Sequence, residues 1–543
     1  MVEGFDYVIV GAGSAGCVLA LRLSEAGRSV CVLEAGPKDS NPFIHIPAGY
    51  IKNVFDPRLT WGFASAPIPG ARGRSIALVQ GKALGGSSAI NGMIYNRCQP
   101  ADYDRWAQLG NLGWRYDDVL PYFRKSERRI GKADERFRGR EGPLTVADLD
   151  FSHLLCDLFV EAAESLGVPY VADYNAASQE GVGPFQFTID SSGGRPVRAG
   201  AASAFLRPAV RTGRATVRPM CLVERILFEG GQAVGVRYRR GDAHGLGAEV
   251  RARREVIVSA GALNTPRLLQ VSGVGGGEHL RALGIDVVAE SPGVGANLSD
   301  HYQVRLSARL HGIETINERA RGLRLVGEIL KWVAGRSSIL GIGPVPMRLF
   351  HRSDPRLETP DIQMSFTPAS FQEGMTGLLD RYPGLTIGGY QQRPESRGYV
   401  RAKSADVSAA PEIQPNYLDA AADRAAIVEV VKMARRLMHA PAFAPYLIGE
   451  TFPGPTVAND AEILEFVRQA GGTAYHHMGT ARMGPDGDAM AVVDPRLRLR
   501  GATALRVVDA SIMPTPVSGN TNAPTTMIAE KSADMILADA REG

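Results

Sequence analysis

A glycine pattern within the first 36 residues limits the fold of this chain more than any other feature. Residues 7–10 form a short apolar run with three β-branched side chains, which is typical of a buried parallel strand. A G-x-G-x-x-G pattern follows, and residues 14–26 place apolar side chains at helical spacing. A second apolar run at 30–33 ends on Glu34. The order strand, turn, helix, strand and acid predicts a dinucleotide-binding unit.

Each residue of the pattern has a physical role in such a unit. Gly11 allows a tight turn, Gly13 lets the backbone approach a pyrophosphate, and Gly16 lets helix and strand pack closely. The helix N-terminus offers free N–H groups to the pyrophosphate. Glu34, 18 residues after Gly16, can accept hydrogen bonds from a ribose diol. This context disfavours the alternative, an ordinary glycine-rich turn between a strand and a helix.

Length, charge and cysteine usage set further limits. The 543 residues correspond to two large domains or to about three or four average ones. The net charge of +4 is too small to indicate a nucleic-acid partner or an anionic membrane. No transmembrane segment and no signal peptide are expected, because long apolar runs are lacking and the first strand begins almost at once. Five scattered cysteines without C-x-x-C spacing are typical of reduced thiols in a cytoplasmic protein.

The rest of the chain predicts a second unit. Residues 37–75, rich in Pro, Gly and Asn, should form a cover over the ligand. The small residues at 85–88 should let the backbone lie flat against it, and the apolar residues up to 94 favour a helix. Residues 102–127 predict two helices, with a break at Pro121. Further expected elements are a hairpin at 222–228 and 233–238, strands at 255–261, 361–366 and 398–401, and helices at 153–167 and 421–439.

Five motifs, in order, are DYVIVGAGSAG, GKALGGSSAINGM, GALNTPRLLQVSGVG, YHHMGTARMG and VSGNTNAPTTMIAEKSADMI. Together they resemble the glucose–methanol–choline (GMC) oxidoreductases, from residue 5 to residue 537. The resemblance implies FAD rather than NAD, a choice that the glycine pattern leaves open. It also implies oxidation of an alcohol.

The resemblance also assigns site residues. His476 matches the family's catalytic base in His-x-x-Gly-Thr, and Asn520 matches the second catalytic position. A histidine suits the first role because its ordinary pKa lies near working pH, and an amide can donate to the developing alkoxide. Residues expected to line the FAD site are Gly11, Gly13, Ser14, Gly16, Glu34, Ala35, Gly86, Ser88, Asn91, Val223, Ala260, Asp509 and Thr521. Candidate substrate contacts, each with a core role as an equal alternative, are Tyr50, Phe63, Met364, Phe366 and His477.

Three positions depart from the family pattern. Ile90 stands where some members attach FAD through a histidine, so non-covalent FAD is expected. Cys98 stands where Gly is usual, and Gln80 where many members have Arg. His476 and His477 could also be considered as a metal pair, but adjacent residues on a strand point to opposite faces, and no metal is expected.

The expected fold is α/β (α+β overall), with a Rossmann-like FAD-binding domain and a substrate domain that has a mainly antiparallel sheet. The FAD domain is expected at 1–155, 210–310 and 468–543, and the substrate domain at 156–209 and 311–467. The expected reaction oxidises a primary or secondary alcohol by hydride transfer to flavin N5, and a quinone-type carrier accepts the electrons. The alternatives are an O2-using alcohol oxidase of the furfuryl or aryl alcohol type and, third, an FAD-containing lyase. The expected location is cytoplasmic, or peripheral to a membrane for a quinone-linked enzyme.

Overall fold

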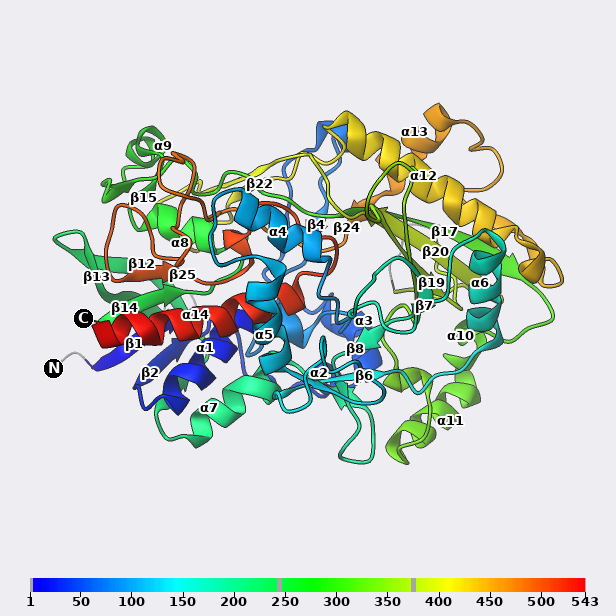
Figure 1. Cartoon of the computed structure of the whole chain (residues 1–543), viewed down its shortest axis with the longest axis horizontal. Coiled ribbons are helices and arrows are strands. Elements are labelled where there is room, and N and C mark those ends of the chain that lie inside the picture. Colours follow the sequence, from blue (N-terminus) through cyan, green and yellow to red (C-terminus); the bar gives the residue numbers. More distant parts are fainter. Residues whose placement is uncertain (1–2, 242–246, 373–376, 543) are drawn as a thin grey trace.

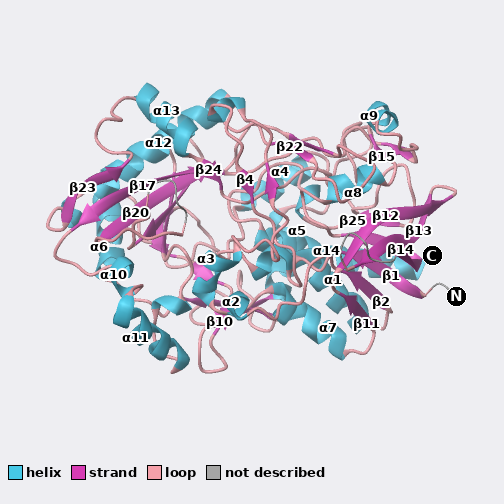
Figure 2. Ribbon diagram, turned by 180° about the vertical axis from the view of Figure 1, so that it is seen from behind, coloured by secondary structure: helices cyan, strands magenta, loops and turns pink. Residues whose placement is uncertain are grey.

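Two β-sheets dominate the computed structural model of the chain, one at each end of the molecule (Figures 1 and 2). The structure describes residues 3–241, 247–372 and 377–542. The N-terminal sheet and the C-terminal helix lie at the same end, while the second sheet lies at the other. The expected fold class, with one Rossmann-like and one mainly antiparallel unit, is confirmed.

The first sheet is a parallel core with an antiparallel extension. Its apolar strands are buried on both faces, as parallel strands between helices should be; Val8, Val32 and Ile257 have no exposed area. β1 lies between β2 and β14, parallel to both, in a register that pairs Val8 with Cys31 and Val256. The strand order is β11 (Ala215–Arg218), β2 (Val30–Leu33), β1 (Gly4–Val10), β14 (Gly247–Val258), β13 (Gln232–Arg240) and β12 (Cys221–Glu229), with β25 (Leu505–Val507) parallel to β14.

Helices from distant parts of the chain cover this sheet. α1 (Ser14–Glu25) buries Val18, Leu19 and Leu23 and packs against α14 (Asn522–Glu542) and α7 (Arg207–Arg211). α14 in turn contacts α5 (Tyr116–Ser126). The expected break at Pro121 is wrong: α5 continues through this residue, so the proline costs the helix one hydrogen bond without ending it.

The second sheet is antiparallel. Its strand order is β23 (Leu447–Phe452), β17 (Tyr302–Leu310), β20 (Gly384–Gln391), β19 (Ile362–Thr367), β18 (Met347–His351) and β7 (Gly181–Pro184), with β24 (Gly472–Thr473) on β17. α12 (Ala421–Met438) packs on β20, β17 and β19, and α6 (Leu154–Ser165) packs on β7, β18 and β19. Both helices match their expected ranges within two residues. The apolar cores of the two sheets form separate clusters of buried side chains.

Strand β17 also bears on the expected domain boundary. It precedes residue 311, where the sequence placed the substrate domain, yet it pairs with β20 and β23 in the second sheet. We therefore propose that the substrate unit begins at Tyr302.

Short elements make up the connections. Residues 37–75 contain α2 (Pro42–His45), α3 (Tyr50–Asn53) and β3 (Phe63–Ala64). The expected helix up to residue 94 is wrong: a 3₁₀ turn, Gly86–Ala89, is followed by irregular chain in which Met93 has φ of 63°. Other described elements are β4 (Ala77–Leu78), α4 (Pro100–Gln108), β5 (Glu127–Arg129), β6 (Leu144–Asp148), β8 (Gln186–Phe187), β9 (Ile189–Asp190), β10 (Val197–Arg198), α8 (Thr265–Val271), β15 (Val274–Gly275), α9 (Gly277–Ala282), β16 (Ala289–Glu290), α10 (Ile316–Arg319), α11 (Gly322–Val333), β21 (Tyr399–Arg401), β22 (Glu412–Gln414) and α13 (Asp460–Ala470).

Candidate active site

A cavity between the two sheets collects residues from the carboxyl ends of four parallel strands. Gly11 follows β1, Glu34 follows β2, Ala260 follows β14 and Asp509 follows β25, and all four line the cavity. Ligands of open α/β sheets bind at this edge. The opposite wall comes from the second sheet, through residues of β17, β19 and β20.

The glycines at this edge are required by close backbone contacts. A Cβ on Gly16 would lie 1.9 Å from the carbonyl oxygen of Gly11, and one on Gly11, at φ of 102°, would lie 2.5 Å from that of Ser259. A Cβ on Gly86 would lie 2.7 Å from the Cα of Gly13. Gly13 itself begins α1 without a side-chain cap, and the first turn of α1 has no acid. The bare helix N-terminus beside a glycine floor therefore fits the pyrophosphate of FAD.

Two acidic residues stabilise the backbone at this edge of the first sheet through hydrogen bonds. The carboxylate of Glu34 accepts from Ala12 N and Gly36 N, each at 2.8 Å. Burial raises the pKa of Glu34, while these backbone N–H groups oppose the rise. Asp509 accepts from Gly261 N at 2.8 Å and from the hydroxyl of Thr265 at 2.6 Å. Each oxygen of Glu34 has further acceptor capacity, so this residue remains able to receive the hydroxyls of a ribose.

Most residues assigned to FAD lie on the cavity wall. These are Gly11, Gly13, Ser14, Glu34, Ala35, Gly86, Asn91, Val223, Ala260, Asp509 and Thr521. Gly16 and Ser88 lie behind the wall, where Gly16 packs α1 on β1 and the Ser88 hydroxyl bonds Gly85 O and Ala201 N. The Asn91 oxygen accepts from Met93 N and from the buried Arg198 guanidinium at 2.7 Å, which leaves its NH₂ group free to donate toward a ligand.

His476 and Asn520 meet on the cavity wall, although 44 residues separate them in the chain. The distance from His476 Nε2 to Asn520 Nδ2 is 2.9 Å. Asn520 lies just before the N-terminus of α14, and His476 lies in the loop after β24. The assignment of these two residues to one site thus has a geometric basis.

Hydrogen bonds fix the tautomer of His476 from one side. His301 Nε2 lies 2.8 Å from the carbonyl oxygen of Gln392, which can only accept, so this nitrogen carries the hydrogen. Burial lowers the pKa of His301, which is therefore neutral with a bare Nδ1. His301 Nδ1 lies 2.9 Å from His476 Nδ1, so the hydrogen between them belongs to His476. His476 then carries its lone pair on Nε2.

Hydrogen bonds between amide side chains on the other side of the His476 ring assign the same tautomer. Cys98 N donates to Asn96 Oδ1 at 2.8 Å, which turns the Asn96 NH₂ group toward Gln363 Oε1 at 3.2 Å. Gln363 Nε2 then lies 3.5 Å from Asn520 Oδ1, and the Asn520 NH₂ group faces His476 Nε2. A backbone N–H at one end and a backbone carbonyl at the other thus assign every hydrogen in this amide–imidazole chain, which comprises Asn96, Gln363, Asn520, His476 and His301.

Asn96, Gln363 and His301 were missed by the sequence analysis. Gln363 belongs to the predicted strand at 361–366, whereas His301 directly precedes β17. The period-2 alternation of a strand could have indicated Gln363 as the counterpart of its apolar neighbours. No sequence signal links these residues to His476.

Burial keeps His476 uncharged. Burial first, and then the neighbouring His301 and His477, lower its pKa well below the ordinary value. A neutral imidazole that carries its lone pair on Nε2 is the form of histidine that can take a proton at this atom.

The buried carboxylate of Asp300 organises the loop that carries this base. It accepts from His476 N at 2.7 Å and His301 N at 2.9 Å, and also from the hydroxyls of Tyr417 and Thr473. His477 Nε2 lies 3.4 Å from the same carboxylate, outside hydrogen-bond geometry.

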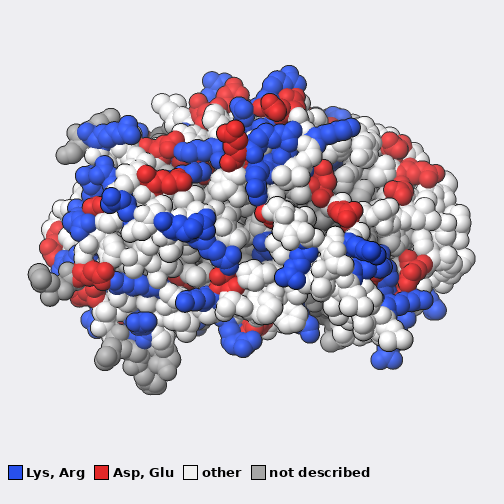
Figure 3. All heavy atoms as spheres, turned by 90° about the horizontal axis from the view of Figure 1, so that it is seen from below, with Lys and Arg blue, Asp and Glu red and all other residues white. Residues whose placement is uncertain are grey.

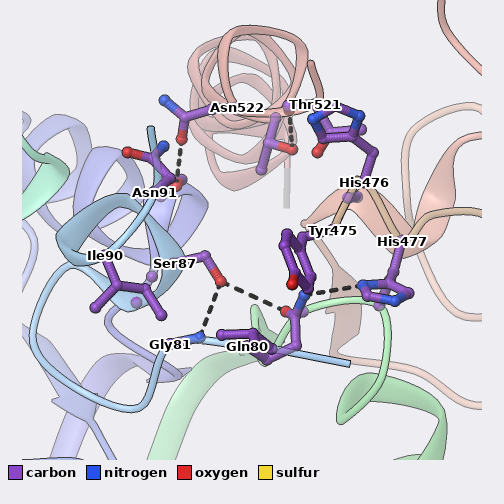
Figure 4. A pocket seen from close by; sticks show the side chains of 18 of the residues that line it. Gln80, Gly81, Ser87, Ile90, Asn91, Tyr475, His476, His477, Thr521 and Asn522 are labelled. Atoms are coloured by element: carbon purple, nitrogen blue, oxygen red, sulfur yellow. Dashed lines mark hydrogen bonds between the residues drawn. The ribbon is translucent and has the colours of Figure 1, made fainter. Parts of the chain in front are cut away.

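The three departures from the family pattern lie in this region. Gln80 Nε2 lies 3.1 Å from His477 Nδ1 and so donates to it (Figure 4). Cys98 has φ of 65°, in the left-handed region that favours glycine, which accounts for the usual Gly at this position. Ile90 is buried and lines the cavity.

The candidate substrate contacts separate into two groups. Tyr50, Met364 and His477 line the cavity, whereas Phe63 and Phe366 do not. Phe366 stacks on Phe159 of α6 at 4.7 Å, because residue 366 lies on the helix-covered face of β19. Phe63 stacks on Trp61, which lines the cavity in its place. We therefore do not propose a substrate contact for either phenylalanine.

A cation, Arg305, also lines the substrate end of the cavity. Burial raises the pKa of Tyr50 to about 12 and also raises that of Tyr475, and the positive charge of Arg305 opposes both shifts. The acids on the cavity wall, Glu34 and Asp509, are on the first sheet. Within residues 3–241, 247–372 and 377–542, no group of three or more His, Cys, Asp or Glu could hold a metal ion.

Two family models match the chain, both described as GMC oxidoreductase, at residues 5–303 and 394–529. The chain belongs to the GMC oxidoreductase family. The family match makes this protein an FAD-dependent oxidoreductase.

Known proteins resemble the chain over almost its whole length. Human mitochondrial choline dehydrogenase is 40% identical over 550 residues, covering 98% of this chain and 90% of the relative. The crystal structure of pyridoxine 4-oxidase from Mesorbium loti is 30% identical with a TM-score of 0.86, covering 97% and 98% of the two chains. A formate oxidase from Aspergillus oryzae, studied for FAD modification, is 26% identical with a TM-score of 0.91 and 99% coverage of both chains.

Proposed function

We propose that this protein oxidises a primary or secondary alcohol to the aldehyde or ketone, with His476 as the base. The observation that carries the proposal is the contact of His476 Nε2 with the Asn520 NH₂ group at 2.9 Å on the cavity wall, with His301 Nδ1 accepting the hydrogen of His476 Nδ1. The reaction removes a proton from the alcohol oxygen and a hydride from the carbon that bears it. FAD, when bound, accepts that hydride at N5.

His476 performs the proton transfer. Its lowered pKa keeps it neutral at physiological pH, so Nε2 can accept the hydroxyl proton when the alcohol oxygen takes the place of the Asn520 N–H at this atom. Asp300 accepts a hydrogen bond from the backbone N–H of His476, and His301 Nδ1 accepts the hydrogen of His476 Nδ1 and so orients the ring. A positioned base of this kind contributes typically ~10² to 10⁴ in rate.

Asn520 stabilises the oxygen from which the proton leaves. Its NH₂ group is turned toward His476 Nε2 because Gln363 holds its oxygen. The two hydrogens of this group can be shared between the imidazole and a substrate oxygen that carries developing negative charge. The N-terminus of α14, which starts two residues after Asn520, adds a positive dipole end on the same wall.

An uncharged alcohol fits this cavity better than a cationic one. Arg305 places a positive charge among the aromatic side chains of the cavity, and the two acidic wall residues are already held by backbone N–H groups on the FAD side. A quaternary ammonium group would gain from aromatic faces but would be repelled by Arg305. The proposed substrate therefore differs from that named for the choline dehydrogenase relative.

The proposed electron acceptor is a quinone-type carrier. The alternative, O2, is supported by the similarity to a protein named pyridoxine 4-oxidase. A lyase of the same family is the third candidate, which would turn over without an acceptor. We propose that FAD is bound non-covalently because Ile90 offers no group for attachment.

An anaerobic experiment tests this function. The purified yellow holoenzyme is mixed with a panel of aliphatic and aromatic alcohols and with choline while the flavin absorbance is followed. Bleaching by uncharged alcohols, with aldehyde or ketone formed in equal amount, is the expected result, and slow recovery in air would support the carrier over O2. An FAD-loaded enzyme that no alcohol in the panel bleaches would contradict the proposal.

A further inference from the structure

Helix α11 is oriented against the usual pattern for a surface helix. It exposes five aliphatic side chains along one stripe: Leu323 (89%), Val326 (50%), Ile329 (42%), Leu330 (64%) and Val333 (57%). A surface helix normally turns such a stripe toward the core. Scattered exposed aliphatic residues need no explanation, but a contiguous stripe of five marks a contact surface.

The side of α11 that faces the protein carries Glu328 and Trp332. Glu328 is buried and pairs with Arg319 at 2.8 Å and with Lys331 at 2.9 Å, and it accepts from Ile339 N at 3.0 Å. Although burial opposes ionisation, these partners lower the pKa of Glu328 to about 2. Trp332 is buried beside it and donates to Pro196 O at 2.9 Å. The aliphatic stripe therefore faces outward, because rotating the helix would break these ion pairs and hydrogen bonds of Glu328 and Trp332.

Cations border the aliphatic stripe. The charged side chains that α11 exposes are Arg324 (62%), which pairs with Glu314 at 2.8 Å, and Lys331 (50%), which pairs with the inward-turned Glu328 at 2.9 Å. Arg336 follows on the exposed chain beyond the helix, and Arg195 lies over the Trp332 ring at 4.7 Å. Figure 3 views the molecule from the side on which α11 lies, and Lys and Arg outnumber Asp and Glu on this face. The overall charge of +4 concealed this local pattern.

The stripe adjoins the cover of the active-site cavity. The 3₁₀ turn Ile339–Gly341, just after α11, contacts the turn Pro47–Gly49 within the cover. Pro344 then lines the cavity itself, and so does Phe55 of the cover, which is 62% exposed. A surface bound by α11 would therefore lie on the side of the molecule where the cover is accessible.

We propose that α11 docks this protein on an anionic lipid surface, with the aliphatic stripe in the acyl–headgroup boundary and the bordering cations against lipid phosphates. An aliphatic face with a cationic border is what an interfacial helix requires. A second copy of the chain fits less well, because pairing two stripes would bring their cations together. A protein partner also fits less well, since interface hot spots favour Trp, Tyr and Arg over Leu and Val. The structure contains no helix among its described residues that is long and apolar enough to cross a membrane, so docking would be peripheral.

Flotation of the intact holoenzyme with vesicles tests the proposal independently of the reaction. The protein is mixed with vesicles of phosphatidylcholine alone or with 30% phosphatidylglycerol. We expect it to float with the anionic vesicles at low salt and to be released as salt rises. The double variant L323Q/L330Q should bind at least tenfold more weakly, with unchanged flavin content. The control I448Q/L112Q, which changes two exposed aliphatic residues away from α11, should bind as the wild type does.

Three results would overturn the proposal. The first is a wild-type protein that stays unbound with anionic vesicles, and the second is an L323Q/L330Q variant that floats as the wild type does. The third is a dimer in sedimentation velocity that L323Q/L330Q dissociates without any vesicle binding, which would assign the stripe to a second copy of the chain. Because no step depends on alcohol oxidation, failure here leaves the proposed function untouched.

Discussion

His301 should control the reactivity of His476 without touching the substrate. Its bare Nδ1 accepts the hydrogen of His476 Nδ1 at 2.9 Å and so keeps the lone pair on Nε2. His301→Leu removes that acceptor, whereas His301→Asn places an amide oxygen near the same position. Leu and Asn have nearly the same shape, and both lose the stacking of His301 on Tyr390 at 4.6 Å. The pair therefore isolates the hydrogen bond from packing.

The size of the effect follows from burial. His301 has no exposed area and His476 is 9% exposed, so water does not readily replace the lost acceptor. An unsatisfied buried donor costs about 1–3 kcal/mol. At about 1.4 kcal/mol per factor of ten, the tautomer with Nε2 bare becomes roughly 5- to 150-fold less favourable. Flavin reduction by alcohol should slow by that factor in His301→Leu and by only a few-fold in His301→Asn.

Anaerobic stopped-flow spectroscopy measures this rate at saturating alcohol, and the dissociation constant of the alcohol comes from the same titration. Flavin content and thermal unfolding of both variants confirm that they fold. Equal slowing in His301→Leu and His301→Asn would assign the loss to packing and refute the tautomer argument. A His301→Leu variant as fast as the wild type would refute it as well.

Four further results are expected. The lowered pKa of His476 means that its base form persists as pH falls, so the flavin-reduction rate should stay constant from pH 9 to 6.5 and decline only below it; an acid limb centred above pH 7 would contradict the burial argument. Arg305→Ala should raise kcat/KM for choline relative to an uncharged alcohol of similar size, and an unchanged ratio would remove Arg305 from the specificity argument. Acid denaturation should release all FAD into the supernatant, because Ile90 offers no attachment point, and flavin that stays with the precipitate would contradict this. Cys98→Gly should change the free energy of unfolding by less than about 1 kcal/mol, because relief of the left-handed backbone strain offsets the lost burial of the side chain. Cys156→Gly, in helix α6, should destabilise the protein by more than that. Urea unfolding that ranks the two variants in the reverse order would contradict the strain argument.

Local sequence patterns were sufficient to predict structure where residues close in the chain form one turn, helix or hairpin. Gly11 and Gly16 act within one turn, so their spacing alone predicted the close backbone contacts that the structure shows. The helix at 421–439 and the hairpin after residue 221 follow in the same way from periodicity. The motif resemblance located His476 and Asn520, which the fold then brings to 2.9 Å.

Long-range pairing was beyond such patterns. His301 and Gln363 reach His476 and Asn520 because β17 and β19 take fixed places in the second sheet, and no local spacing encodes that register. Phe366 was selected for its aromatic ring, yet it stacks on Phe159 of α6, while Gln363, Met364 and Ser365 of the same strand line the cavity. Pro121 lies within α5 because one lost hydrogen bond is tolerated by a helix packed on α14.

The most direct test of the account is the rate of anaerobic flavin reduction by alcohol in His476→Ala beside the wild type. The variant should bind FAD normally, since the glycine turn and Glu34 belong to the first sheet and His476 to the loop after β24, and reduction should slow by ~10² to 10⁴. The loss should be greatest above pH 6.5, where the wild-type imidazole is neutral. A variant that retains FAD and is reduced at the wild-type rate would contradict the assignment of His476 as the base.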